Sequence, residues 1–199
     1  MTSKTGERRT EILQMLAALL EKPNAARVTT AALAARLNLS EAALYRHFAS
    51  KAQMFEGLFE FIESTIFSLI NQIKTAESDE IEQLRQTTGM LLSFAKRNPG
   101  MTRVLTGDAL VNEDIRLQER ANQIISRIET TYKQILRQAI TREQIGADTD
   151  VTAIASVLTH YVMGRWLRFT QSGWQIEPTE NMLANINGML LAITPPIQY

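Results

Sequence analysis

The chain of 199 residues contains no cysteine, which excludes disulfide frameworks, thiolate metal sites and cysteine nucleophiles. It has only nine glycines and five prolines, so few positions interrupt regular structure. Charged residues divide every apolar stretch well before the roughly 18 residues that a membrane-spanning helix requires. The first residues are charged without an apolar run behind them, so we expect no signal peptide and a cytoplasmic protein.

The sequence also lacks the common motifs of enzymes. It has no glycine-rich phosphate loop, no His-Glu-x-x-His and no nucleophile elbow. His160 fits a core or interface position better than a metal ligand. The acidic residues at 112–114 and 148–150 fall at predicted helix starts, where carboxylates favour the positive end of the helix dipole. We therefore predict a protein without catalytic activity, metal or cofactor.

The net charge is zero at pH 7, yet the charges are unevenly distributed. Residues 1–51 contain eight basic and four acidic side chains, a net charge of +4, and residues 52–199 carry the balancing −4. A positive first quarter indicates that this end meets a polyanion, although an excess of four charges can also arise by chance.

Apolar residues recur at spacings of three and four along most of the chain, without a sustained alternation of period two. This pattern predicts an all-α fold of about nine helices. We expect a helix-turn-helix DNA-binding domain at residues 1–50 and a helical dimerisation and partner-binding domain at residues 51–199. The expected helices are 7–22, 30–37, 41–47, 51–74, a helix capped by Ser78 or Asp79 and ending near 97, 101–105, 113–142, 151–171 with Asp150 as its cap, and 178–193.

Residues 28–51 have the pattern of a helix-turn-helix. Thr29 or Thr30 caps the first short helix and leaves backbone N–H groups that suit a DNA phosphate. Asn38 follows the last apolar position of that helix, where a left-handed turn residue is expected, and Ser40 caps the next helix.

On the second short helix, Leu44 and Phe48 point inward and the other side chains point outward to varying degrees. Small residues at its start, followed by Tyr45-Arg46-His47, fit the major groove of DNA. The alternative is an ordinary helical hairpin with a solvated polar face. That alternative does not require two short capped helices in this order, followed by a basic residue at Lys51, so we predict DNA binding.

The spacing Thr-Thr-(x)2-Leu-Ala, then Leu-Ser-(x)3-Leu-Tyr-(x)-His-Phe-(x)-Ser-Lys, resembles the DNA-binding signature of TetR-family regulators. The resemblance implies a dimer whose recognition helices enter successive major grooves. It also implies phosphate contacts from Thr30, Tyr45, His47 and Lys51, with the remaining outward residues of the second helix facing bases. The predicted DNA-binding residues are Thr29, Thr30, Ala31, Glu41, Ala42, Ala43, Tyr45, Arg46, His47 and Lys51.

Further stretches resemble one branch of that family, the nucleoid occlusion factors. They are residues 40–48, 55–63, 97–100 and 102–107, with weaker similarity through 129. The resemblance implies binding to palindromic chromosomal sites and, on DNA, to the C-terminal tail of the tubulin-like division protein FtsZ, whose assembly is then blocked over the nucleoid. The implied tail-binding residues are Phe61, Arg97 and Asn98. Leu69 departs from this branch, where an arginine facing the tail is expected.

Two questions about the helical body stay open from sequence. The apolar faces of 151–171 and 178–193 either form a four-helix dimer interface or complete the core of one subunit; we favour the interface. Their apolar residues at helical spacing are Ile154, Val157, Leu158, Tyr161, Val162, Met182, Leu183, Ile186, Met189, Leu190 and Ile193. Alternative functions are a transcriptional repressor released by a small apolar ligand and a helical adaptor. A ligand pocket would draw on Phe67, Met90, Phe94, Met163 and Trp166.

Overall fold

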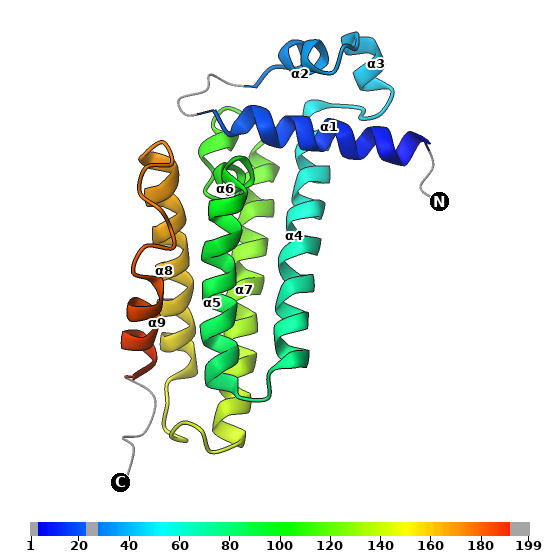
Figure 1. The fold of residues 1–199 in the computed structure, drawn as a ribbon. Helices are drawn as coiled ribbons and strands as arrows, with labels where there is room; N and C mark the ends of the chain where they lie inside the picture. Colours follow the sequence, from blue (N-terminus) through cyan, green and yellow to red (C-terminus); the bar gives the residue numbers. More distant parts are fainter. Residues whose placement is uncertain (1–3, 23–27, 192–199) are drawn as a thin grey trace. The chain divides into compact units, whose positions relative to one another are not determined.

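The computed structural model describes residues 4–22 and 28–191, and this part of the chain is helical without any strand (Figure 1). The predicted all-α fold class is confirmed, with nine α-helices and one short 3-10 helix in the described ranges. The elements are α1 Lys4–Leu20, α2 Thr30–Arg36, α3 Glu41–Tyr45, α4 Lys51–Ala76, α5 Glu80–Arg97, α6 Pro99–Leu105, η1 Asp108–Leu110, α7 Ile115–Thr141, α8 Val151–Gln171 and α9 Met182–Leu191. Each helix of these ranges is too short or too polar to cross a membrane.

Side-chain caps begin two of the long helices where the sequence predicts them. The Asp79 carboxylate accepts a hydrogen bond from the Glu82 N–H at 2.9 Å. The Asp150 carboxylate accepts from the N–H groups of Thr152 and Ala153, each at 3.0 Å. All three bonds satisfy backbone donors that the first helical turn leaves without an intrahelical partner.

The last helix starts later than the predicted position 178. Residues 178–181 form turns, and α9 begins at Met182. Asn181 has a φ of 53°, a left-handed conformation that a right-handed helix cannot include. The predicted stop of the first helix at residues 23–24 and the apolar position Ile193 lie outside the described residues.

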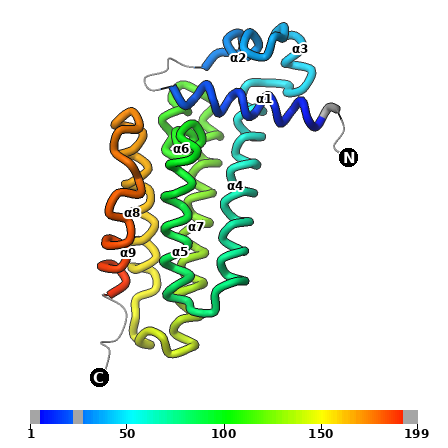
Figure 2. The backbone as a smooth tube through the Cα atoms, in the orientation of Figure 1, coloured from blue at the N-terminus to red at the C-terminus, as the bar shows by residue number. Residues whose placement is uncertain are grey.

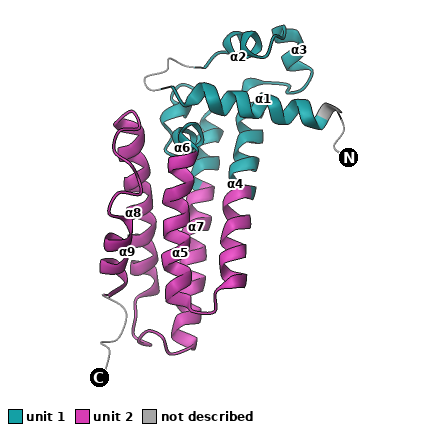
Figure 3. Ribbon diagram, viewed as in Figure 1, with its two compact units in different colours: residues 1–64, 98–122 teal, residues 65–97, 123–199 magenta. Residues whose placement is uncertain are grey.

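The chain packs into two compact units (Figure 3). Unit 1 comprises residues 1–64 and 98–122, and unit 2 comprises residues 65–97 and 123–199. Both α4 and α7 begin in unit 1 and end in unit 2. The predicted division at residue 50 concerns roles rather than packing, so it stays a prediction.

In unit 1, α1 contacts α2 and α6, and α2 contacts α3. The approach of α6 to α1 depends on Gly100, because a side chain there would overlap the carbonyl oxygen of Ala17. Pro99 is the first residue of α6, a position where its missing N–H costs no hydrogen bond. Arg103 then donates to the carbonyl of Leu20 at 3.2 Å and thereby satisfies the end of α1.

In unit 2, the axes of α5, α7 and α8 are nearly parallel, with α7 running opposite to α5 and α8 (Figure 2), and α5 contacts both α8 and α9. Trp166 is buried and its indole N–H donates to the carbonyl of Leu91 at 3.1 Å. Tyr132 is fully buried, and its hydroxyl lies 2.9 Å from that of Thr88. The polar group of each of these two side chains has a partner, so the apolar core tolerates both large rings.

Candidate nucleic-acid interface

The caps of α2 and α3, and the turn between these helices, have the geometry that the sequence predicts. The Thr29 hydroxyl accepts from the Ala32 N–H, and the Ser40 hydroxyl accepts from the Ala43 N–H, both at 3.1 Å. Asn38 has a φ of 54°, so the predicted left-handed turn residue is confirmed. These local bonds hold two short helices that would be unstable alone.

The helix α3 buries one face and exposes the other. Leu44 and Phe48 are 0% and 1% exposed, so the predicted inward residues are confirmed. Tyr45 is 44% exposed despite its large ring. The exposed residues of this segment are Glu41, Ala42, Tyr45 and Arg46, while Ala43 and His47 are half-buried. The outward face is therefore small at the start of α3 and polar toward its end, as a groove-binding helix needs.

Thr30 and Glu41 join the starts of α2 and α3. The Thr30 hydroxyl donates to Glu41 Oε2 at 2.6 Å. A hydroxyl has one proton, and a DNA phosphate at neutral pH only accepts hydrogen bonds. The expected phosphate contact from the Thr30 hydroxyl therefore competes with the bond to Glu41.

Lys51, the expected phosphate ligand at the start of α4, is also engaged within unit 1. Its ammonium forms an ion pair with Glu113, and it lies 5.7 Å from the centre of the Phe55 ring. The Lys51 side chain is 19% exposed. A DNA phosphate at this position would share Lys51 with a protein carboxylate.

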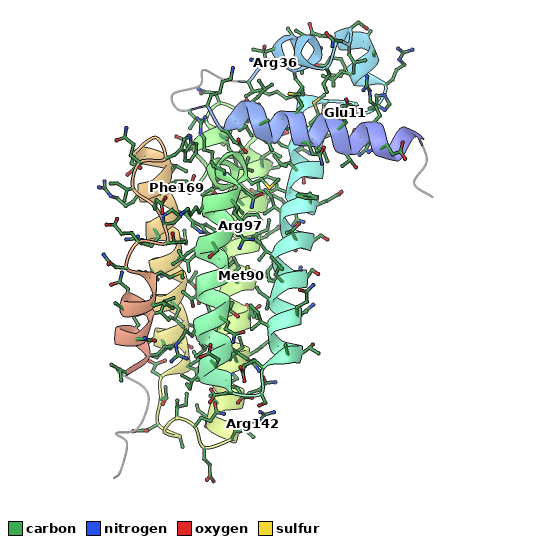
Figure 4. The ribbon with its side chains drawn as sticks, viewed as in Figure 1. Glu11, Arg36, Met90, Arg97, Arg142 and Phe169 are labelled. Carbon is green, nitrogen blue, oxygen red and sulfur yellow. The ribbon has the colours of Figure 1, made fainter. Side chains whose placement is uncertain are left out.

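Sequence reasoning missed Arg9, which holds the segment after α3. Its guanidinium donates to the carbonyl of His47 and lies 4.1 Å above the Phe48 ring centre. Nothing in the sequence distinguishes Arg9 from Arg8, because the contact spans 38 residues. Arg36 is a second basic residue that is absent from the predicted DNA-binding residues. It is exposed at the end of α2 (Figure 4).

The three residues implied in FtsZ-tail binding occupy different elements. Phe61 is 46% exposed on α4, in unit 1. Arg97 is exposed at the end of α5, where a basic side chain also suits the helix dipole (Figure 4). Asn98 is half-buried, and its carbonyl accepts from the hydroxyl of Thr102 at 2.9 Å in the first turn of α6.

The residues proposed for an apolar ligand pocket have other roles or orientations. Trp166 and Phe94 are buried in unit 2, Phe67 lies beneath the guanidinium of Arg127 at 3.8 Å, and Met163 is 38% exposed. A groove of about 320 Å³ in unit 2 is lined by other residues, namely Ile81, Arg85, Asn187, Leu190 and Leu191. None of these observations favours a ligand-released repressor.

The apolar residues of α8 and α9 divide between the core and the surface. Leu158, Val162, Ile186 and Leu190 are at most 2% exposed, so their assignment to a dimer interface is wrong: they fill the core of unit 2. Other apolar side chains of the same helices face outward, namely Val157, Met163, Leu167, Leu183 and Leu191. Gly164 and Gly188 have open space where a side chain would lie, so another helix can approach these helices closely.

Two family models cover most of the chain. The model of bacterial regulatory proteins of the tetR family matches residues 12–58, and the SlmA-like tetracyclin repressor-like C-terminal domain matches residues 78–191. Nucleoid occlusion factor SlmA from Aliivibrio fischeri is 50% identical over 181 residues, which are 90% of this chain and 92% of that protein. The chain belongs to the TetR family, in its SlmA group.

A second relative and two solved structures agree with this assignment. SlmA from Idiomarina loihiensis is 47% identical over 92% of this chain and 94% of its own length. A TetR regulator from Chloroflexus aurantiacus has a TM-score of 0.80 at 19% identity, covering 96% of this chain and 98% of that one. The regulator FadR from Bacillus halodurans has a TM-score of 0.79 at 12% identity, covering 94% and 97%. These two structures show a shared TetR fold, and the resemblances inferred from the sequence are confirmed.

Proposed function

We propose that this chain is a nucleoid occlusion factor that binds palindromic chromosomal sites as a homodimer and, on DNA, antagonises FtsZ assembly. The observation that carries the proposal is the segment of α3 and its C-cap, where Tyr45 and Arg46 are exposed while Leu44 and Phe48 are buried. This element lies in a chain that is 50% identical to a nucleoid occlusion factor over nine-tenths of its length.

The outward apolar side chains of α8 and α9 support the homodimer. Two such helices from each copy would form a four-helix interface. Leu183 is 60% exposed and Val157 is 52% exposed, which is costly for apolar side chains that stay in water. A two-fold dimer places two copies of α3 on the two halves of a palindrome.

Phe61 and Arg97 support the FtsZ contact. Phe61 offers a large exposed aromatic side chain, and Arg97 offers an exposed cation at the end of α5. Aromatic and arginine side chains are the usual anchors of peptide and protein partners. Asn98 adds an amide beside Arg97.

A test begins with selection of bound duplexes from a random pool, followed by anisotropy titrations at two salt concentrations. Tyr45→Ala combined with His47→Ala should weaken binding at least tenfold for the selected site, because both side chains are expected to contact phosphates. Arg127→Ala, which removes an exposed cation of unit 2, is the control. Unchanged affinity of the Tyr45/His47 variant for every duplex would contradict DNA binding by α3.

The FtsZ step is tested with the selected duplex and a labelled FtsZ C-terminal peptide. Binding of the peptide to the DNA-bound protein, lost in Phe61→Ala and Arg97→Ala while DNA binding persists, supports it. An absence of peptide binding in the presence of DNA would refute it. Mapping of the chromosomal sites separates the two candidate roles, because scattered sites fit nucleoid occlusion and a single promoter fits a repressor.

A further inference from the structure

The hydrogen bond between Thr30 and Glu41 sets the position of an acidic side chain on the DNA-facing side of the helix-turn-helix. Glu41 is the first residue of α3, exposed, and next to the exposed Ala42. Its Oε2 accepts the Thr30 hydroxyl proton at 2.6 Å across 11 residues of sequence. An exposed glutamate otherwise samples many rotamers, so this bond restricts where the carboxylate lies.

A carboxylate on this face is unfavourable for DNA binding in general. It faces a polyanion, and DNA affinity in this class of protein comes largely from cations that neutralise phosphates. A carboxylate improves discrimination between bases when it accepts a hydrogen bond from the correct base and repels the acceptor groups of the wrong ones. Glu41 also suits the positive end of the α3 dipole, but its fixed position on the exposed face gives it a role in base selection as well.

The major groove offers only two kinds of donor to a carboxylate. These are the exocyclic amino groups of cytosine, N4, and of adenine, N6, whereas guanine O6 and thymine O4 are acceptors that repel it. Glutamate and aspartate pair most directly with cytosine N4. The carboxylate keeps acceptor capacity for such a group after it has accepted the Thr30 proton, since two oxygens offer about four lone-pair sites.

We propose that Glu41 is a specificity-determining residue that reads an exocyclic amino group, cytosine N4 first, at one symmetric pair of operator positions, and that Thr30 is its positioning residue. The inference rests on the proposed function. The small side chains of Ala42 and Ala43 allow the start of α3 to approach the base edges. Thr30 then influences base choice through Glu41, since its single proton is committed to that carboxylate.

The experiment compares wild type with Glu41→Ala, Glu41→Gln, Thr30→Val and Thr30→Ser. Each protein is used to select duplexes from a random pool, and its affinity is then measured for the preferred site and for every single base-pair change. Thr30→Val keeps the shape of the side chain without its hydroxyl, and Thr30→Ser keeps the hydroxyl. Circular dichroism melting verifies that each variant is folded.

In the wild type, replacing the amino-bearing base at one symmetric pair should weaken binding about tenfold or more. Glu41→Ala should lose this discrimination at that pair alone and bind random duplexes more tightly than wild type, because a negative charge is removed. Glu41→Gln should retain less discrimination than wild type. Thr30→Val should lose part of the base discrimination, and Thr30→Ser should keep the discrimination of the wild type.

Unchanged base preferences in Glu41→Ala would overturn the inference. A Thr30→Val change in base preference that persists in a Thr30→Val/Glu41→Ala double variant would also overturn it, because Thr30 would then influence base choice independently of Glu41. If wild type itself selects no sequence, the proposed function fails, which is a different outcome from a selective protein whose preferences ignore Glu41.

Discussion

The ammonium of Lys51 and the carboxylate of Glu113 form an ion pair across 62 residues of sequence, and the Glu113 side chain is only 6% exposed. The pair places a negative charge beside Lys51 at the start of α4. Lys51 is also the residue from which a DNA phosphate contact is expected. Glu113 therefore opposes that contact in the DNA-free protein.

Glu113→Gln should raise the affinity for both specific and random duplexes about threefold or more, because Lys51 regains its full charge toward DNA. The slope of log affinity against log salt should steepen by up to about 1, the contribution of one phosphate contact. The measurement is anisotropy over a salt series. Glu119→Gln, which removes an exposed negative charge on α7, is the control. A lower DNA affinity of Glu113→Gln would indicate instead that Glu113 positions Lys51 for DNA.

Arg9→Ala should weaken binding to the selected site about tenfold while affecting random duplexes less. The substitution removes the hydrogen bond to the His47 carbonyl and the cation–π contact with Phe48, so α3 is held less firmly. Arg8→Ala removes the same charge one residue earlier, where the side chain pairs with Glu11 on the surface. If both variants lose affinity equally, Arg9 contributes charge and not orientation.

Gly100→Ala should destabilise the protein by roughly 2 kcal/mol, because the added carbon overlaps the Ala17 carbonyl and forces α6 away from α1. Thermal melting should show a fall in Tm of several degrees. Gly89→Ala is the matched control, since its added carbon meets only Met182 at 3.6 Å, an ordinary contact. The control should be neutral or slightly stabilising because alanine favours helices. Equal melting temperatures for the two variants would contradict the close packing of α6 on α1.

Leu183→Glu and Val157→Glu should convert the homodimer into a folded monomer. Both side chains are more than half exposed within the chain, so the charge disturbs the surface between copies and not the core. Light scattering after size-exclusion chromatography measures the mass, and the affinity for the palindrome should fall with it. Val111→Glu, at a position 65% exposed in unit 1, should remain dimeric. Dimers of unchanged mass in both α8 and α9 variants would place the interface elsewhere.

The pH dependence of stability should contain a contribution from Tyr132. Its complete burial raises the pKa of the phenol above its usual value of about 10. A raised pKa in the folded state means that the stability is fully present below about pH 10 and is lost as the pH rises further, when the unfolded chain ionises first.

Urea unfolding between pH 7 and pH 11 measures this effect. Tyr132→Phe should reduce the alkaline fall in the free energy of unfolding, at a cost near 1 kcal/mol for the lost bond to Thr88. Thr88 keeps its bond to the Leu84 carbonyl at 2.7 Å, so no donor is stranded. Tyr45→Phe, which removes an exposed hydroxyl on α3, is the control. A Tyr132→Phe protein with an unchanged alkaline fall would refute the role of Tyr132.

The helical class, most helix positions and the helix-turn-helix can be predicted from the sequence, because these features depend on interactions within a few residues. Thr29, Asn38 and Ser40 act on backbone groups three residues away or less, so their roles can be read from spacing. The same spacing carried the TetR resemblance.

The sequence does not reveal which side chains meet across long sequence separations, nor which apolar residues stay on the surface, because both depend on long-range packing. The pairs Lys51–Glu113 and Arg9–His47 join residues with no shared local pattern. Helical periodicity shows that α8 has apolar positions, but Leu158 and Val157 are neighbours of similar character, and only packing buries the first and exposes the second. Local spacing encodes bonds along one helix, whereas the choice of its neighbours depends on how the entire chain packs.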